Sequence, residues 1–403
     1  MKKKKILIPK LRFPEFRGKG EWEKKVLENI SPSIFDGTHQ TPRYTQKGIP
    51  FFSVENIVSG NKNKFISIED HLAATNKNKP EKGDILITRI GNIGFSTVVD
   101  WEYEFSIYVT LAVVKKSKQF ISYYLHCFFQ SDFYQMEIRN KSLLNAVPCK
   151  INMDALRKTS ALLPSIKEQQ KIAKCFFYLD DVITAQTKKL ESLKTHKKGL
   201  MQQLFPGGKK TVPKLRFTEF RNSEKWKSLF IKDIAVVTTG DKDTQDKVDN
   251  GKYPFFVRSQ TVERINSYSY DGEAILTSGD GVGVGKNFHY IIGKFDFHQR
   301  VYCIYNFSEF VEGSFVFLYF SEFFHKRVTQ LSAKNSVDSV RMTMITEMPI
   351  KIPNIAEQRK IAACLSSFEE LISAQAKKLE ALKLHKKGLM QQLFPVVEEQ
   401  QYE

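Results

Sequence analysis

Two stretches of the chain carry apolar residues at alternating intervals of four and three positions. The first stretch lies between Pro164 and Pro206, and the second lies between Pro353 and Pro395. This spacing puts the apolar residues on one face of an α-helix and is typical of a coiled-coil seam. We expect the seam to contain Leu179, Ile183, Gln186, Leu190, Leu193, Lys197 and Leu200, together with Ile372, Gln375, Leu379, Leu382, Lys386, Leu389 and Leu393.

Each of the two stretches opens with a helix start signal. Ser165 is followed by Glu168 three residues later, and Asn354 and Glu357 repeat the pattern, which predicts a capping box at each helix start. Because the closing prolines end both helices, each seam spans roughly 50 Å at 1.5 Å per residue. We predict that the two helices pair as an intramolecular antiparallel coiled coil; the alternative is that each stripe packs on its own domain.

The polar seam positions predict a register for this coiled coil, since opposed amides and amines satisfy one another. The expected pairs are Gln186 with Lys386, Gln375 with Lys197, Leu190 with Leu382, and Leu193 with Leu379. A shift by one heptad would set Lys197 against Phe368 and desolvate its amine without a partner.

The chain is an internal duplication. An opening motif, Pro9–Arg17, recurs 204 positions later as Pro213–Arg221, and a Trp follows each copy. The helical block at 164–206 recurs 189 positions later, whereas the bodies between motif and block differ greatly and the second is 15 residues shorter. Constant ends with divergent middles indicate two modules that perform one task on two different targets. A geometric requirement shared by both modules would explain why their ends stay alike.

Both bodies have the pattern of mixed α+β structure with short strands. Strands are predicted at 49–54, 84–89, 253–259 and 273–277, loops at 91–94 and 279–286, and a buried helix-length segment at 121–136. The chain therefore divides into a first body (1–163), a helical block (164–206), a second body (207–352, with a linker at 207–212), a second helical block (353–395) and a tail (396–403).

Composition points to a polyanionic partner. The chain carries Lys+Arg 62 against Asp+Glu 44, a formal charge of +18 and a pI of about 9.4, and cations along a phosphate backbone gain from counterion release. The alternative is a basic protein without such a partner. No apolar run approaches the ~18 residues of a membrane span, and the apolar stretch after Met1 is too short for a signal peptide. Five scattered cysteines without a Cys-x-x-Cys motif indicate reduced thiols, no metal site and a cytoplasmic location.

Motifs for catalysis are not evident. Gly285-Lys286 resembles the end of a Walker A loop, but Asp280 and Asn287 occupy positions that need Gly and Ser/Thr, so a nucleotide site is disfavoured. A turn that contacts DNA phosphate and a purely structural turn remain equally open. There is no Asn/Asp-Pro-Pro-Tyr/Phe methylase motif, nuclease pattern, Gly-x-Ser-x-Gly or His-Glu-x-x-His. These absences favour a binding protein over an enzyme.

The ordered, duplicated motifs resemble the specificity subunits of type I restriction-modification enzymes. The resemblance covers essentially the whole chain. It rests on the Pro-Lys-Leu-Arg-Phe opening motifs, Ile49–Phe52, Gly83–Gly91, His298–Tyr302 and two Pro-x-x-x-Glu-Gln-x-Lys-Ile-Ala segments.

The resemblance implies an α+β chain with two target-recognition domains separated by an antiparallel two-helix coiled-coil spacer. Each domain would read one half of a bipartite, asymmetric site in double-stranded DNA, and the spacer would keep the readers about one DNA turn apart. It also implies two methyltransferase subunits and ATP-driven restriction subunits as partners in bacterial defence. S-adenosylmethionine, ATP and magnesium would be bound by those partners, and this chain would carry no cofactor, no catalytic residue and no membrane contact.

Base-reading chemistry gives candidate DNA contacts, since Arg and Lys read guanine and Asn and Gln read adenine. They are Arg43, Asn56, Arg89, Asn92 and Lys141 in the first body, and Arg258, Gln260, Lys286, Gln299, Arg300, Lys334 and Arg341 in the second. Each has an alternative as a solvated surface group, or for Arg300 a buried structural pair. Two other functions stay open: an adapter that binds RNA or an acidic protein, and a stand-alone restriction or methylation enzyme.

Overall fold

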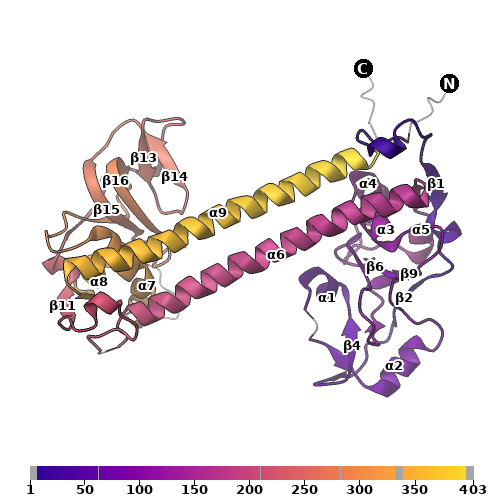
Figure 1. The fold of residues 1–403 in the computed structure, drawn as a ribbon, viewed down its shortest axis with the longest axis horizontal. Coiled ribbons are helices and arrows are strands. Elements are labelled where there is room, and N and C mark those ends of the chain that lie inside the picture. Colours follow the sequence, from indigo (N-terminus) through magenta and orange to yellow (C-terminus); the bar gives the residue numbers. More distant parts are fainter. Residues whose placement is uncertain (1–6, 62, 209, 282, 332–338, 396–403) are drawn as a thin grey trace. The chain divides into compact units, whose positions relative to one another are not determined.

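The computed structural model describes residues 7–61, 63–208, 210–281, 283–331 and 339–395. The chain divides into two compact units. Unit 1 comprises residues 1–187 and 377–403, and unit 2 comprises residues 188–376. The boundary runs through both long helices, α6 (Ile166–Leu204) and α9 (Ile355–Leu393), so each unit holds one body, the start of one helix and the end of the other (Figure 1).

The two long helices confirm the predicted helical blocks. Their first turns are capped as expected: Ser165 Oγ accepts a hydrogen bond from Glu168 N at 3.4 Å, and Asn354 Oδ1 accepts one from Glu357 N at 2.9 Å. The carboxylates of Glu168 and Glu357 bind arginines instead of the cap backbone. The capping box is therefore only half formed, because both oxygens of each carboxylate have a stronger, charged donor.

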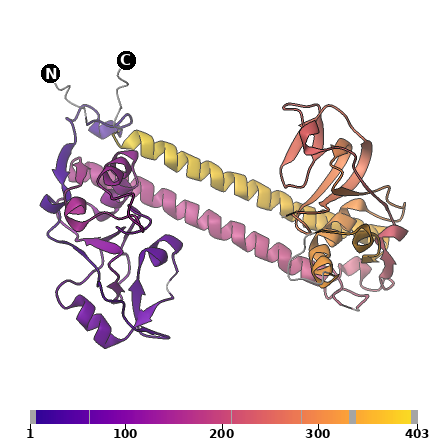
Figure 2. The ribbon, with the colours of Figure 1, turned by 180° about the vertical axis from the view of Figure 1, so that it is seen from behind.

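Within each unit the two helix segments run antiparallel. In unit 1 the end of α9 lies beside the start of α6, as both views show (Figures 1 and 2), and Lys386 Nζ donates to Asp180 at 2.6 Å. In unit 2 Lys197 pairs with Glu369, and the rings of His196 and Phe368 stack at 5.3 Å. All fourteen predicted seam residues are buried or half-buried.

The predicted register is wrong by one heptad. Lys386 lies level with Leu179 and not with Gln186, and Lys197 lies level with Phe368 and not with Gln375. The lysine amines are not left without partners, because Asp180 and Glu369 follow those apolar positions directly and supply a carboxylate to each. The register therefore depends on acidic residues that adjoin the seam and not on the seam residues alone.

The register can be tested by crosslinking within unit 1. Extending it along the helices places Ile183 level with Leu382, so cysteines at these two positions should form a disulfide on mild oxidation, since opposed seam positions bring Cβ atoms to bridging distance. Cysteines at positions 186 and 386, the pair expected from the sequence alone, are the matched control. Non-reducing gels report the crosslink. A disulfide between positions 186 and 386, without one between 183 and 382, would reject the register.

The body of unit 1 contains three small sheets with helices against them. The strand orders are β1-β10, β2-β9-β6-β7 and β3-β5-β4-β8. The elements are η1 (Pro14–Phe16), β1 (Glu23–Val26), η2 (Leu27–Asn29), β2 (Ile34–Asp36), β3 (Tyr44–Thr45), β4 (Ile49–Phe52), α1 (Val54–Ser59), β5 (Phe65–Ile66), α2 (Ile68–Thr75), β6 (Ile85–Thr88), β7 (Ser96–Val98), β8 (Ser106–Ile107), β9 (Leu111–Val114), α3 (Ser122–Phe129), α4 (Asp132–Asn140), α5 (Met153–Arg157) and β10 (Ser160–Leu163).

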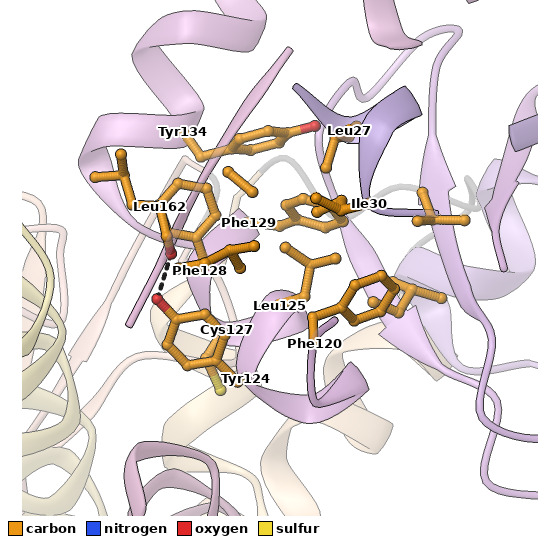
Figure 3. Packing of buried hydrophobic residues seen from close by; sticks show 14 of the residues in the cluster. Leu27, Ile30, Phe120, Tyr124, Leu125, Cys127, Phe128, Phe129, Tyr134 and Leu162 are labelled. Atoms are coloured by element: carbon orange, nitrogen blue, oxygen red, sulfur yellow. Dashed lines mark hydrogen bonds between the residues drawn. The ribbon is translucent and has the colours of Figure 1, made fainter. Parts of the chain in front are cut away.

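The segment predicted as one buried helix at 121–136 forms the centre of the unit 1 core as two helices, α3 and α4. Ser131 breaks it by capping α4, its hydroxyl accepting from Tyr134 N. Figure 3 shows the aromatic side chains of this pair facing Leu27, Ile30 and Leu162, with the Tyr124 hydroxyl donating to the Leu162 carbonyl at 2.6 Å. That bond satisfies the polar end of a fully buried tyrosine.

The body of unit 2 is built round one six-stranded sheet of order β12-β17-β15-β16-β13-β14, with β11 and β18 paired beside it. The elements are η3 (Thr218–Phe220), β11 (Lys227–Phe230), η4 (Ile231–Asp233), β12 (Val236–Thr239), η5 (Thr244–Asp246), β13 (Tyr253–Phe256), β14 (Val262–Ile265), β15 (Tyr270–Ser278), β16 (Phe288–Phe297), β17 (Val301–Tyr305), α7 (Gly313–Leu331), α8 (Met342–Thr346) and β18 (Pro349–Ile352). The predicted strands are present in both bodies, at slightly shifted bounds.

The strands that the two bodies have in common are connected and paired in the same way. β4 pairs in parallel with β8 in unit 1, and β13 pairs in parallel with β16 in unit 2. A glycine lies at the same close approach in each: a Cβ at Gly37 would meet the Ile107 carbonyl oxygen at 2.1 Å, and one at Gly240 would meet that of Phe297 at 1.9 Å. The single strand β16 corresponds to β7 and β8, which an insertion separates. The fold class is therefore confirmed: mixed short strands and helices with two long antiparallel helices.

The predicted division into bodies, helical blocks and tail is a functional one and stays a prediction. The tail at 396–403 lies outside the described residues. All five cysteines are free thiols, as expected. Among the residues that the structure describes, none of the helices is long and apolar enough to cross a membrane, and no group of His, Cys, Asp and Glu could hold a metal ion.

Candidate nucleic-acid interface

The opening motif and the helical block of each repeat are joined by a buried ion pair. Arg12 Nε and NH2 donate to the two carboxylate oxygens of Glu168, both at 2.7 Å. Arg216 does the same to Glu357 at 2.8 and 2.7 Å. Hydrogen bonding to Glu357 raises the pKa of Arg216 above its ordinary value, although burial opposes this. This bidentate pair explains why the opening motif and the helical block are each alike in the two repeats, while the bodies between them differ.

The end of each long helix completes the core of the opposite repeat. Phe394, directly after α9, packs edge-on against Trp22 at 6.1 Å and stacks on Phe176 at 6.0 Å. Phe205, directly after α6, packs in the same way against Trp226 at 6.5 Å. Both phenylalanines are almost fully buried. Each body thus rests on an equivalent frame, which consists of the opening motif, its ion pair with the start of one long helix, and the phenylalanine that follows the other long helix.

Two of the five candidates in the first body are internal. The Asn56 side chain, 3% exposed, caps α1 by accepting from Ser53 N at 3.0 Å and donates to the carbonyl of Asn61 at 2.9 Å. Arg89, 7% exposed, donates to Asp36 at 3.0 Å and to the Val109 carbonyl at 2.9 Å. Burial lowers the pKa of Arg89, although Asp36 opposes the shift. Their bonding groups are engaged inside the body, so the structure argues against both as DNA contacts.

The other candidates of the first body lie nearer the surface but are not brought together. Arg43 is exposed before β3, and Asn92 is exposed in the turn between β6 and β7. Lys141 is half-buried, and its amine lies 3.2 Å from Glu137. DNA contact by these three residues stays a prediction.

Candidates of the second body gather round Asp280. Arg258 NH1 donates to Asp280 Oδ1 at 2.8 Å, and Arg300 NH1 donates to Asp280 Oδ2 at 2.7 Å. Gln260 lies beside them and donates to the Lys286 carbonyl and to Asn287 Oδ1, at 3.2 and 3.0 Å. These side chains come from the turns that follow β13, β15 and β16, and their hydrogen bonds bring the three turns together on one surface.

The remaining candidates of the second body are more dispersed. Gln299 donates to Asp243 at 2.9 Å, and Arg341 is exposed at the start of α8. The Lys286 side chain is exposed as well. Lys334 lies outside the described residues, so its prediction is neither supported nor opposed.

The glycine-rich loop at 279–286 is a hairpin connection and not a nucleotide-binding loop. It joins β15 to β16, whose pairing brings Thr277 opposite Phe288. A Walker A loop must lead into a helix whose N-terminus faces the phosphates, and here a strand follows. Two further residues of this surface, Asp280 and Asn287, were not among the candidates predicted from the sequence. Their signal was a pair of polar residues flanking a turn.

Comparison with known proteins agrees with this architecture. The family model described as type I restriction modification DNA specificity domain matches residues 19–195 and 223–384. The type I restriction enzyme MjaVIII specificity subunit of Methanocaldococcus jannaschii is 25% identical over 375 residues, which cover 86% of this chain and 85% of that protein. The EcoDI specificity subunit of Escherichia coli is 28% identical over 158 residues, covering 39% and 34%.

Solved structures share the fold. The type I restriction-modification S subunit from M. genitalium has a TM-score of 0.70 at 14% identity and covers 97% of this chain and 100% of that one. A chain from a structure of the complex assembly and conformational transition of the type I system has a TM-score of 0.53 at 13% identity, covering 93% and 97%. With two family matches that together span most of its length, the chain belongs to the type I restriction-modification DNA specificity family, whose members are the recognition subunits of these enzymes and not the catalytic ones.

Proposed function

We propose that the chain reads a bipartite, asymmetric site in double-stranded DNA, with one body for each half-site. The observation that carries this proposal is that the ion-paired ends of the two repeats are alike, whereas the exposed turns of the two bodies are not. The ion pairs Arg12–Glu168 and Arg216–Glu357 repeat almost atom for atom, whereas the turns after equivalent strands carry different chemistry. Selection for one task on two different targets has this signature, and the formal charge of +18 supplies attraction to the phosphates.

We further propose that two adenine-N6 methyltransferase subunits and ATP-dependent restriction subunits act on the DNA that this chain selects. The internal repeat supports equal docking of two identical partners, because duplicated frames offer duplicated surfaces. S-adenosylmethionine, ATP and magnesium would be bound by those partners and not by this chain. The complex would work in the cytoplasm, where the DNA is.

Exchange of one body tests the assignment of half-sites. Replacing residues 222–352 by the matching segment of another family member, with the opening motif and helical block retained, should change one half of the methylated motif. The other half should stay the same, because the first body is untouched. The measurement is genome-wide mapping of methylated adenines in cells that carry the chain with its partners.

The reciprocal exchange in the first body is the control, and it should change the other half alone. A simultaneous change of both halves in either exchange, with the protein still folded, would contradict one body per half-site. Unaltered motifs in both exchanges would contradict DNA recognition by the bodies altogether.

A further inference from the structure

We infer that Asp280 is a positioning residue that presents Arg258 and Arg300 to a guanine in the half-site read by the second body. The inference rests on the proposed function and deepens it. Arginine reads guanine best when its planar fork faces O6 and N7 squarely, so a reader gains from any group that fixes the guanidinium beforehand.

The geometry of the three side chains fits this role. Each carboxylate oxygen of Asp280 takes one NH1 group, from Arg258 at 2.8 Å and from Arg300 at 2.7 Å. Among the residues that the structure describes, neither guanidinium group donates a hydrogen bond to anything but Asp280, so their outer N–H groups face no competing acceptor there. The side chains of Arg258 and Arg300 are 41% and 60% exposed, while that of Asp280 is only 21% exposed. The Asp280 carboxylate therefore lies beneath the two guanidinium groups, which face outward.

The backbone holds the carboxylate in place. Gly279 N donates to the Arg300 carbonyl at 2.8 Å, and a Cβ on Gly279 would lie 2.9 Å from that oxygen. Asp280 itself forms a β-bridge with Ser339. Although partial burial opposes it, hydrogen bonding from the two arginines lowers the pKa of Asp280, which therefore stays ionised. Asp280 is thus a fixed anion on a basic surface.

An anion at this place weakens attraction to phosphate, because it cancels one of two positive charges. A surface that only held the DNA backbone would bind more tightly without it. Its presence is explained if orientation of the arginines matters more than their net charge, which is the requirement of base reading and not of backbone contact.

The first body lacks this arrangement. The equivalent strand pairings put Val54, Ile90 and Thr110 where the second body has Arg258, Asp280 and Arg300. There Thr110 Oγ1 accepts from Val54 N at 3.1 Å, and the neighbouring Arg89 is buried. The two bodies therefore differ in chemistry at this matching position, as expected where they read different bases.

Base-preference profiling of the purified full-length chain tests the inference. Duplexes selected from a random pool at physiological salt give the wild-type profile, and Asp280→Asn is then compared with it. We expect discrimination at one G·C pair of one half-site to fall by about 5- to 150-fold, the value of one bidentate contact. The other half-site should be unchanged, and affinity for unrelated duplexes should be equal or higher.

Matched variants complete the test. Asp271→Asn makes the same charge change at an exposed acid of the same body, 4.0 Å from Lys294, and should leave the profile unaltered. Asp280→Glu should keep part of the preference. Arg258→Lys and Arg300→Lys should relax the same G·C position, since a lysine cannot bind bidentately, and they decide the matter if Asp280→Asn fails to fold.

Two results would overturn the inference. An Asp280→Asn profile identical to the wild type would mark the acid as purely structural. A uniform loss of affinity for every duplex would mark the arginines as phosphate contacts. A wild-type chain with no preference among duplexes would instead contradict the proposed function. The two failures are therefore distinguishable.

Discussion

Phe394→Ala is expected to lower the free energy of unfolding of unit 1 by about 3–5 kcal/mol, the usual range for removing a buried phenylalanine. Phe394 is 1% exposed. Its ring contacts Trp22, Tyr124, Phe128 and Phe176, so its loss leaves a cavity lined by rings from three separate segments. The large rings cannot close such a cavity without leaving their rotamers. Hydrogen exchange with mass spectrometry measures the effect, because it reports unit 1 and unit 2 separately.

Leu384→Ala is the matched control for Phe394→Ala. Leu384 lies on α9, the helix that Phe394 directly follows, but is 70% exposed, so its truncation should change the free energy of unfolding by less than about 0.5 kcal/mol. Exchange in α3 and α4 should accelerate in the first variant only. Equal effects of the two variants would show that Phe394 does not anchor the core of unit 1.

Glu357→Ala is expected to destabilise unit 2 by about 3–5 kcal/mol, because it leaves the Arg216 guanidinium buried without its carboxylate. The Glu357 side chain is 1% exposed and that of Arg216 is 7% exposed. The carbonyls of Ser223 and Glu224 still accept from Arg216, but they cannot neutralise its charge. Denaturant unfolding combined with hydrogen exchange gives the loss and locates it in unit 2.

Glu219→Ala provides the comparison, since Glu219 belongs to the same opening motif and pairs with Lys360 at 3.4 Å on the surface. An exposed pair of this kind contributes at most about 1 kcal/mol. Glu168→Ala should reproduce the effect of Glu357→Ala in unit 1. If Glu357→Ala were no more harmful than Glu219→Ala, the bidentate pair would not be what joins motif and helical block.

The periodic parts of the chain were predictable because their physics is local. Seam residues such as Leu190 and Leu379 repeat at helical spacing, and each is buried. The register was not predictable from the seam, since it depends on Asp180 and Glu369, which lie just outside it. The duplicated ends predicted a geometric link, but sequence alone could not name Arg12 and Glu168, 156 positions apart, as its two halves.

The candidate interface shows the same division. Residue type alone cannot tell a surface arginine from a buried one, so Arg89 and Arg300 looked alike in the sequence and differ in the structure. In the sequence, Asn56 follows a strand and could either read a base or cap a helix. In the structure, α1 begins directly after β4, and Asn56 caps it. Asp280 was read only as an obstacle to phosphate, because the two arginines that bind it are 22 and 20 positions away.

The position of Phe394 also bears on how the protein is made. Domains usually fold in the order in which the ribosome releases them. Trp22, Tyr124 and Phe128 are synthesised before the second body, yet Phe394, whose ring completes their cluster, is synthesised after it. The body encoded first can therefore complete its core only after the second body has been synthesised, and a premature stop codon within α9 would leave that first core without Phe394.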